Sequence, residues 1–428
     1  MSSDEIKPFK ISIPESQLSD LKDCLSRTRY PDELEGAGWE YGTPLTEVQR
    51  LVKYWGESFD WRRAEAQLNA FPQFTTDIQA EGFETLNVHF IHQKSSVKDA
   101  IPLLFIHGWP GSFYEGTKLV EPLTQGDPSG EGPAFHVVIP SLPNFGFSQG
   151  TQKRGFSIEH HAEILNKLML RLGYDRYATQ GGDWGWFISR ALSLRYPAHA
   201  RAQHLNLDHG DKPTWTSHPL LALQHAVTPY TAREKRGLAR NAWFAREGGG
   251  YGAVQATRPQ TLGYLLADSP AGLLAWVYEK LRDWTDDGHA WADDEVCTWL
   301  AVYWFSAAGP AASARLYREW VSANANANAG QRTREGEGKG ESAALPLTSA
   351  ALKAWQPRVK VGLAHFPMDV LITPRLWGHT LGKVVFERSH ERGGHFPAWE
   401  RPDAIVADLR EMFAKGAEAR VAIERESA

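Results

Sequence analysis

The sequence predicts an α/β fold with a mostly parallel sheet, because strand-like and helix-like segments alternate along much of the chain. Short apolar runs rich in β-branched and aromatic residues lie between Gly and Pro turns at 86–93, 101–108, 135–142 and 174–182. A helical pattern at 158–173 separates the last two of them. Parallel strands need long crossover connections, so this alternation indicates a sheet covered by helices on both faces.

The order of these segments divides the chain into four expected regions. Before the first strand, residues 9–85 read as turns and amphipathic helices. After about residue 210 helical patterns dominate, and strand-like runs return at 359–366 and 383–389. A helical block that interrupts a sheet is typical of an inserted cap. We therefore expect an N-terminal extension (1–95), the first part of an α/β core (96–210), a helical cap (211–355) and the second part of the core (356–428).

A low-complexity segment interrupts the expected cap at residues 322–345. It consists of an Asn/Ala repeat followed by Gly and charged residues, with almost nothing to bury in a core. We expect a disordered surface loop here. A tether for a regulator or a partner is the alternative interpretation.

Composition favours a soluble protein that acts on small molecules. The formal net charge is −5 and no run of Lys and Arg stands out, which argues against a nucleic-acid partner. The cysteines, Cys24 and Cys297, are too few for a disulfide framework and lack zinc-site spacing, so we expect no metal. Residues 1–10 contain no apolar stretch, and no run approaches the roughly 18 apolar residues of a membrane span. We expect a cytoplasmic protein without a membrane anchor or a cofactor.

One Gly-x-Ser-x-Gly pattern, residues 146–150, nominates Ser148 as a nucleophile. That motif needs a strand running straight into the turn and a helix leaving it. Here Pro140, Pro143 and Asn144 break the approach, and no helix-like run follows directly. We expect Ser148 to serve loop packing instead.

The required strand, tight turn and helix surround Asp183 instead. Residues 181–185 read Gly-Gly-Asp-Trp-Gly, between the strand-like run ending at Gln180 and a helical run that follows. Small flanking residues allow the strained backbone that lifts one side chain above the sheet, and the helix N-terminus favours an anion there. A simple helix N-cap is the alternative role for this aspartate. We interpret Asp183 as the nucleophile.

Residues 107–110, His-Gly-Trp-Pro, follow the apolar strand 101–106, as an oxyanion loop should. The backbone N–H groups of Trp109 and Trp184 would then face a developing negative oxygen. Loss of such stabilisation typically costs roughly 10² to 10³ in rate. We therefore predict that Trp109 and Trp184 form the oxyanion hole.

His395 is the candidate base, in a Gly-Gly-His-Phe-Pro turn between the strand 383–389 and a helical run. The acid that orients it should end the preceding strand, where Asp369 lies. The order of nucleophile, acid and histidine is that of the α/β-hydrolase fold. The expected fold class is therefore an α/β-hydrolase fold with a helical cap insertion and an N-terminal extension.

These motifs together resemble the microsomal-type epoxide hydrolase family, including its soluble fungal members, from about Phe9 to Phe413. HGWPGSFYEG, GGDWG, HFPMD and GGHFPAWERP are similar to its oxyanion loop, nucleophile elbow, acid and histidine motifs. The run PFKISIPESQLSDLKDCLSRTRYPDELEGAGWEYGTP resembles its N-terminal region, which other α/β-hydrolases lack. The resemblance implies epoxide hydrolysis through an ester on Asp183, with a small apolar epoxide and water as reactants. It also suggests a homodimer, and we expect this protein to lack the membrane anchor of microsomal members.

The resemblance further implies two cap tyrosines that hold the epoxide oxygen, Tyr251 and Tyr317. The segments GYGAVQATRPQTLGYLLADSP and RLYREW carry them. Epoxide opening releases an alkoxide, which a phenol with a pKa near 10 can hydrogen-bond and then protonate.

Two other functions fit part of the pattern. A haloalkane dehalogenase would use the same Asp183 and His395, and Trp184 could bind halide, but a departing halide needs no proton donor such as Tyr251 or Tyr317. A non-catalytic small-molecule binder on the same fold is the other alternative, because fold does not imply activity. Such a binder would be free to lose members of the catalytic set, all of which are present here.

Overall fold

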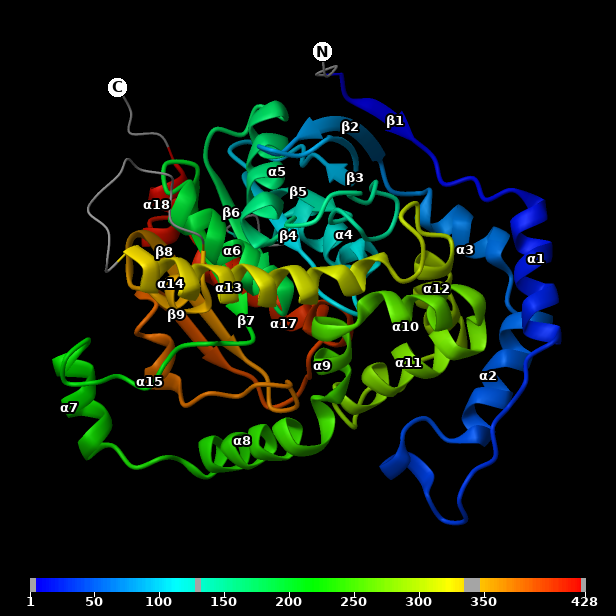
Figure 1. The fold of residues 1–428 in the computed structure, drawn as a ribbon. Helices are drawn as coiled ribbons and strands as arrows, with labels where there is room; N and C mark the ends of the chain where they lie inside the picture. The colour runs from blue at the N-terminus through cyan, green and yellow to red at the C-terminus, as the bar shows by residue number, and fades with distance from the viewer. Residues whose placement is uncertain (1–4, 128–131, 335–346, 425–428) are drawn as a thin grey trace.

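The computed structural model describes residues 5–127, 132–334 and 347–424, and its centre is a nine-stranded sheet (Figure 1). The strand order is β1-β2-β3-β5-β4-β6-β7-β8-β9. Neighbouring strands are antiparallel from β1 to β5 along this order and parallel from β5 to β9. The predicted, mostly parallel sheet is confirmed. The strands are β1 (Lys7–Phe9), β2 (Gln73–Gln79), β3 (Thr85–Gln93), β4 (Ile101–Ile106), β5 (Phe135–Pro140), β6 (Tyr177–Gly181), β7 (Ala200–Asn206), β8 (Gln356–His365) and β9 (Gly382–Ser389).

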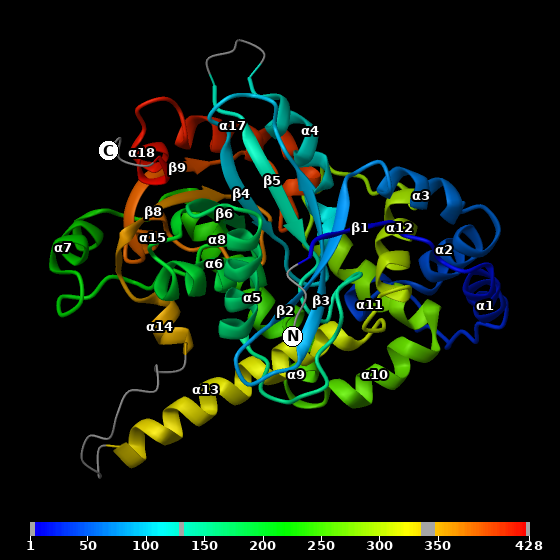
Figure 2. The same ribbon diagram turned by 90° about the horizontal axis from the view of Figure 1, so that it is seen from above.

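Helices cover both faces of the sheet, as strands buried on both sides require. On one face α4 (Thr117–Gln125) packs beside α17 (Pro402–Met412), and on the other α5 (Ile158–Arg171) packs beside α6 (Trp184–Arg195) (Figure 2). Central strand residues such as Leu103 are fully buried. The loops that contain the candidate catalytic residues follow the carboxyl ends of β4, β6, β8 and β9.

The N-terminal region contributes helices and two strands that the sequence analysis did not predict. Its helices are α1 (Glu15–Ser26), α2 (Leu45–Glu57), α3 (Trp61–Leu68) and the 3₁₀ turn η1 (Gly38–Tyr41). Strand β2 extends the sheet beyond β3, and β1 pairs with its outer edge. Strand β2 buries polar side chains, and Gln73 Oε1 lies 2.9 Å from His89 Nε2 of β3. This polar pairing hides the apolar alternation that marks a strand in a sequence.

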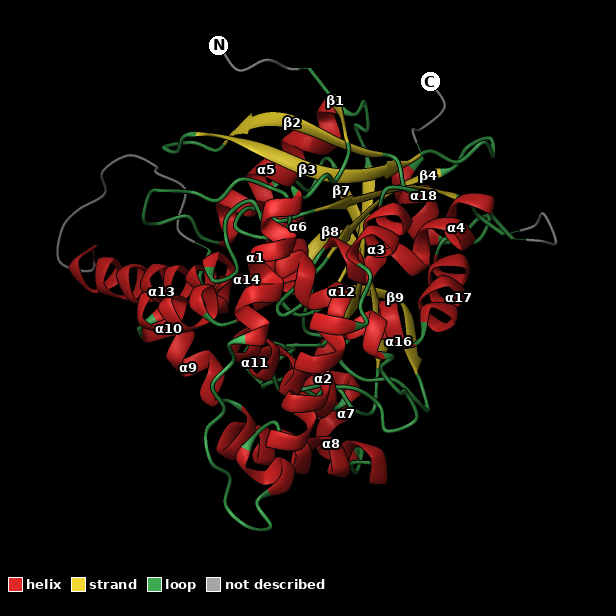
Figure 3. Cartoon of the chain, turned by 90° about the vertical axis from the view of Figure 1, so that its right-hand side faces the viewer, coloured by secondary structure: helices red, strands yellow, loops and turns green. Residues whose placement is uncertain are grey.

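All elements from α7 to α14 lie between β7 and β8 and are called the inserted helices below. Figure 3 shows several of them, including α8, α9 and α11, grouped with α2 below the sheet. Within the described part of the chain, no helix is long and apolar enough to cross a membrane. The inserted helices are α7 (Pro219–Val227), α8 (Ala232–Trp243), the π-helix η3 (Phe244–Gly248), α9 (Gly250–Thr257), α10 (Pro259–Asp268), α11 (Pro270–Asp283), α12 (Asp293–Trp304), the 3₁₀ turn η4 (Ala312–Ala314), α13 (Arg315–Arg334) and α14 (Ser349–Lys353).

The expected disordered loop at 322–345 is wrong over its first part, because helix α13 continues to Arg334. Alanine has the highest intrinsic helix propensity and compensates for the intervening asparagines. The Asn324 side chain also anchors the helix, since its Nδ2 donates to the Trp320 carbonyl and its Oδ1 accepts from the Ser349 N–H, each at 2.8 Å. Residues 335–345 lie outside the described residues.

The N-terminal helices dock directly onto the inserted helices. Helix α2 packs against α11 and α12. The Trp61 ring at the start of α3 lies 5.1 Å from the ring of Phe305, which follows α12, and both side chains are buried. At the rim, Arg50 forms a 2.7 Å ion pair with Asp293. The apolar contact should therefore supply most of the docking energy, with the exposed ion pair a minor addition.

We expect Trp61→Ala to lower the free energy of unfolding by about 3–5 kcal/mol, because it leaves a cavity where the extension meets the inserted helices. Arg50→Ala at the same boundary should cost no more than about 1 kcal/mol, since its ion pair is largely solvated. Urea titration of both variants measures the difference. Equal losses would show that the docking is not governed by the buried rings.

Candidate active site

The turn between β6 and α6 holds Asp183 in a conformation that L-amino acids rarely adopt, with φ 50° and ψ −129°. Such strain persists only where the surroundings enforce it. A Cβ added to Gly185 would lie 1.9 Å from the carbonyl oxygen of Ile106, the last residue of β4. One added to Gly182 would lie 2.1 Å from Asn206 Nδ2. The turn is pressed against its neighbouring strands, and at Gly185 the contact is with backbone, so only glycine fits there.

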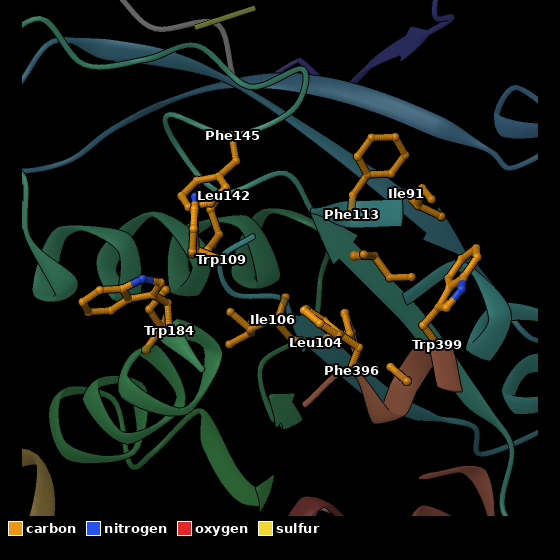
Figure 4. Packing of buried hydrophobic residues seen from close by; sticks show 14 of the residues in the cluster. Ile91, Leu104, Ile106, Trp109, Phe113, Leu142, Phe145, Trp184, Phe396 and Trp399 are labelled. Atoms are coloured by element: carbon orange, nitrogen blue, oxygen red, sulfur yellow. The ribbon is translucent and has the colours of Figure 1, made fainter. Parts of the chain in front are cut away.

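The carboxylate of Asp183 faces the loop after β4. Its Oδ1 accepts a 2.8 Å hydrogen bond from the backbone N–H of Trp109. A Cβ added to Gly108 would lie 2.3 Å from this same oxygen, so only glycine leaves room there. Trp184 follows as the first residue of α6, where the positive end of the helix dipole favours a negative charge. Figure 4 shows the side chains of Trp109 and Trp184 near Ile106, the last residue of β4.

The structure brings His395 and Asp369 to the same place. His395 Nε2 lies 3.5 Å from Asp183 Oδ2, and His395 Nδ1 lies 2.7 Å from Asp369 Oδ1. Asp369 Oδ1 also accepts a 2.7 Å hydrogen bond from the Val370 N–H. His395 is 4% exposed and Asp369 is 2% exposed. The imidazole thus sits between two carboxylates in a site that excludes most water.

These carboxylates dominate the ionisation of His395. Burial by itself lowers the pKa of an imidazole, because it penalises the charged form. The charge of Asp369 and the hydrogen bond to Asp183 outweigh that effect and raise the pKa of His395 to about 10. While both carboxylates are ionised, His395 is therefore an imidazolium at neutral pH.

The two predicted tyrosines come from different inserted helices, Tyr251 from α9 and Tyr317 from α13. The Tyr251 ring stacks on Trp109 at 5.0 Å, and the Tyr317 ring meets the Trp184 ring edge-on at 4.8 Å. Their own rings are 5.9 Å apart. The Tyr317 hydroxyl is buried and lies close to the Tyr251 side chain. Burial, reinforced for Tyr251 by the charge of Asp183, raises the pKa of both phenols. Both are therefore protonated at neutral pH.

Aromatic rings form a wall around Tyr251, Tyr317 and Trp184, the residue after Asp183. Each contributing ring contacts Tyr251, Tyr317 or Trp184 at a centroid distance of 6.5 Å or less. Such a wall suits an apolar ligand and lowers the local dielectric, which strengthens charge interactions inside. The wall consists of Trp109, Trp184, Phe187, Phe244, Trp284 and Trp320.

Sequence reasoning missed Glu115 and Arg240. Glu115 is buried in the turn after the oxyanion loop, and burial raises its pKa to about 8, so it is largely protonated at neutral pH. Arg240 of α8 donates to the carbonyl oxygens of Asp369 at 2.8 Å and Met368 at 3.0 Å. Glu115 lies within the segment HGWPGSFYEG, whose resemblance to the oxyanion-loop motif could have drawn attention to it. Nothing in the sequence near Arg240 indicates that it contacts the loop containing Asp369.

Ser148 uses its only O–H donor within a loop. Its Oγ donates to the Ser141 carbonyl at 2.6 Å and accepts from the His89 N–H at 2.8 Å, and the side chain is fully buried. Its hydroxyl holds a loop together, as its broken sequence context suggests. Among the residues the structure describes, no cluster of three or more His, Cys, Asp or Glu could hold a metal ion.

Two family models match the chain. Residues 6–116 match a model described as the epoxide hydrolase N terminus, and residues 101–226 match one described as the alpha/beta hydrolase fold. The two matches overlap at the oxyanion loop. The first covers the helices and strands that precede the core, and the second covers the nucleophile turn.

Curated relatives and solved structures align over nearly the whole chain. Epoxide hydrolase 1 of Sus scrofa is 32% identical over 433 residues, covering 96% of this chain and 89% of the relative. The structure of Aspergillus niger epoxide hydrolase has a TM-score of 0.76 at 32% identity and covers 95% of this chain and 96% of its own. Juvenile hormone epoxide hydrolase of the silkworm Bombyx mori has a TM-score of 0.81 at 28% identity, with coverages of 96% and 94%. This chain therefore belongs to the epoxide hydrolase family and has the α/β-hydrolase fold.

Proposed function

We propose that this protein hydrolyses small apolar epoxides to vicinal diols through a covalent ester on Asp183. The observation that carries the proposal is the meeting of this strained carboxylate with His395, 3.5 Å away, in a site that also holds two protonated phenols. The names of the relatives point to the same reaction class. We also propose that the inserted helices, within 211–355, act as a cap, because both phenols come from them.

In the first step, Asp183 attacks a ring carbon of the epoxide. Oδ1 is held by the Trp109 N–H, so Oδ2 is the atom we assign to the attack. The new bond joins Oδ2 to carbon, and the carbon–oxygen bond of the ring breaks. The oxygen leaves as an alkoxide that takes a proton from Tyr251 or Tyr317. A carboxylate is already ionised at neutral pH, so this step needs no base.

In the second step, His395 activates water against the ester. Esterification removes the negative charge of Asp183, one of the two charges that raise the pKa of His395. The imidazolium can then give up its proton, which restores the phenol that protonated the alkoxide, and the neutral ring serves as a base while Asp369 holds it. Water attacks the ester carbonyl, whose oxygen is stabilised by the N–H groups of Trp109 and Trp184. The acyl–oxygen bond then breaks, His395 returns to the leaving oxygen the proton that it took from water, and the diol departs from the restored carboxylate.

Isotope labelling tests the nucleophile. After a single turnover in ¹⁸O water, we expect label in the Asp183 carboxylate, because water attacks the ester carbonyl and leaves its oxygen there. Mass spectrometry of the peptide containing residue 183 measures it. Asp183→Ala should abolish turnover, whereas Ser148→Ala should retain substantial activity. Label found only in the diol would mean direct attack by water and would end the ester mechanism.

A double substitution tests the proton donors. Tyr251→Phe combined with Tyr317→Phe should nearly stop ring opening, because no phenol remains to protonate the alkoxide, while circular dichroism stays unchanged. Tyr278→Phe, a phenol of α11 on the side facing the N-terminal helices, should leave the rate intact. Turnover of an aryl epoxide and of a haloalkane should be compared in parallel. An active double mutant, or halide release by the wild type, would favour the dehalogenase interpretation.

His395→Gln separates the two steps. We expect rapid alkylation of Asp183, seen as a mass increase equal to the epoxide, followed by diol release slowed roughly 10² to 10⁴-fold, the range typical of a lost general base. In the wild type, ester hydrolysis should become faster as pH rises through a pKa lower than about 10, because neutral imidazole is the active form and Asp183 no longer carries charge. Normal hydrolysis by the variant would place the base elsewhere.

A further inference from the structure

Glu400, at the end of the short helix α16 (Pro397–Glu400), is a buried carboxyl group with an unusual set of partners. Its side chain accepts three backbone hydrogen bonds of 2.9 Å each. Oε2 accepts from the N–H groups of Gly394 and Asp286, and Oε1 accepts from the N–H of Phe396. The residue is only 8% exposed. A carboxylate that satisfies several amide donors in a dry site is costly to replace, because each lost acceptor leaves a buried N–H unpaired.

The donors flank the candidate base, and the amides beside them are also fixed. Gly393 N–H donates to Asp286 Oδ2 at 2.9 Å, and His395 N–H donates to the Trp284 carbonyl at 2.7 Å. The four consecutive N–H groups at 393–396 are therefore all bound by Glu400 or by residues 284–286. This leaves the backbone that carries the imidazole almost no freedom to shift.

The acceptors at 284–286 belong to the connection between α11 and α12, within the inserted helices. Contact is close, since a Cβ on Gly394 would lie 2.2 Å from the Trp284 carbonyl oxygen. The Trp284 ring packs edge-on against His395 at 4.9 Å and also contacts Tyr251 at 5.1 Å. Glu400 Oε2 bridges this connection and the histidine loop, because it accepts from both Asp286 and Gly394.

We infer that Glu400 is a positioning residue for His395, which fixes the backbone on both sides of the base and joins it to the inserted helices. This inference rests on the proposed ester mechanism. It predicts that loss of Glu400 slows only the second step. Attack by Asp183 does not need a base, whereas ester hydrolysis depends on where the imidazole lies. A displacement of about 1 Å from the reacting geometry can cost on the order of 10² in rate.

Glu400→Gln tests the inference with little change in shape. The amide keeps one oxygen acceptor but turns an NH₂ group toward a backbone donor, so at least one N–H loses its partner. Single-turnover measurements should follow alkylation and hydrolysis separately, with tryptophan fluorescence and mass spectrometry as readouts. We expect alkylation within about twofold of wild type and ester hydrolysis slowed at least about tenfold, toward the 10² limit of mispositioning. The ester should accumulate.

Glu84→Gln is the matched control, because Glu84 also accepts a backbone N–H, from Gln152, and a hydroxyl, from Thr151, in a turn that follows β2. Both of its rate constants should match the wild type. Asp286→Ala, which removes the acceptor for Gly393 N–H, should slow hydrolysis selectively but less strongly. If Glu400→Gln does not fold, Asp286→Ala tests in its place whether loss of a fixed amide beside His395 slows ester hydrolysis selectively.

The possible outcomes separate the positioning role of Glu400 from the ester mechanism on which it rests. If the wild type forms no ester, the proposed function and this inference both fall. If the wild type forms the ester but Glu400→Gln hydrolyses it at the normal rate, only the inference falls. Equal slowing of alkylation and hydrolysis in Glu400→Gln, or in Asp286→Ala should the first variant not fold, would show a merely structural role and would also overturn it.

Discussion

The rest of the site depends on the close crossing of the β6–α6 turn over the end of β4. Gly185 approaches the Ile106 carbonyl so tightly that a Cβ would lie 1.9 Å from it. This backbone contact pins the start of α6 to the strand that leads into the oxyanion loop. It holds Asp183 at positive φ and places its carboxylate within 2.8 Å of the Trp109 N–H. The strained backbone of Asp183 is therefore what directs its carboxylate toward the Trp109 N–H.

Much of this site could be predicted because its signals are local in the sequence. The nucleophile turn, the oxyanion loop and the histidine turn each occupy about five residues, and chain order assigns Asp183, Asp369 and His395 their relative places. The contacts that fix these groups are not local. Arg240 reaches the acid loop from a helix 129 residues away, and Glu400 meets Asp286 across 114 residues. No periodicity or motif encodes such pairings, since they exist only once the inserted helices have docked.

Strand β2 was not predicted and helix α13 was expected to be a loop for a related reason. Both expectations rested on local composition, which does not show tertiary contacts. Strand β2 carries buried polar side chains that pair across the sheet, with Gln73 against His89, so it lacks the alternation of a half-buried strand. Helix α13 runs through an Asn/Ala repeat whose Asn324 bonds to Trp320 and to Ser349 from a later segment. Polar residues with specific partners support regular structure, but the partners are invisible in a single sequence.

The same inserted helices control both halves of the proposed chemistry. They supply the phenols of Tyr251 and Tyr317 for ring opening. They also hold the acid through Arg240, and the base through the Trp284 carbonyl. A shift of these helices would therefore disturb proton donation to the alkoxide and the position of the imidazole together. Because the two steps act on one substrate carbon and one ester in sequence, a shared support keeps the donor and the base aligned with Asp183 throughout the cycle.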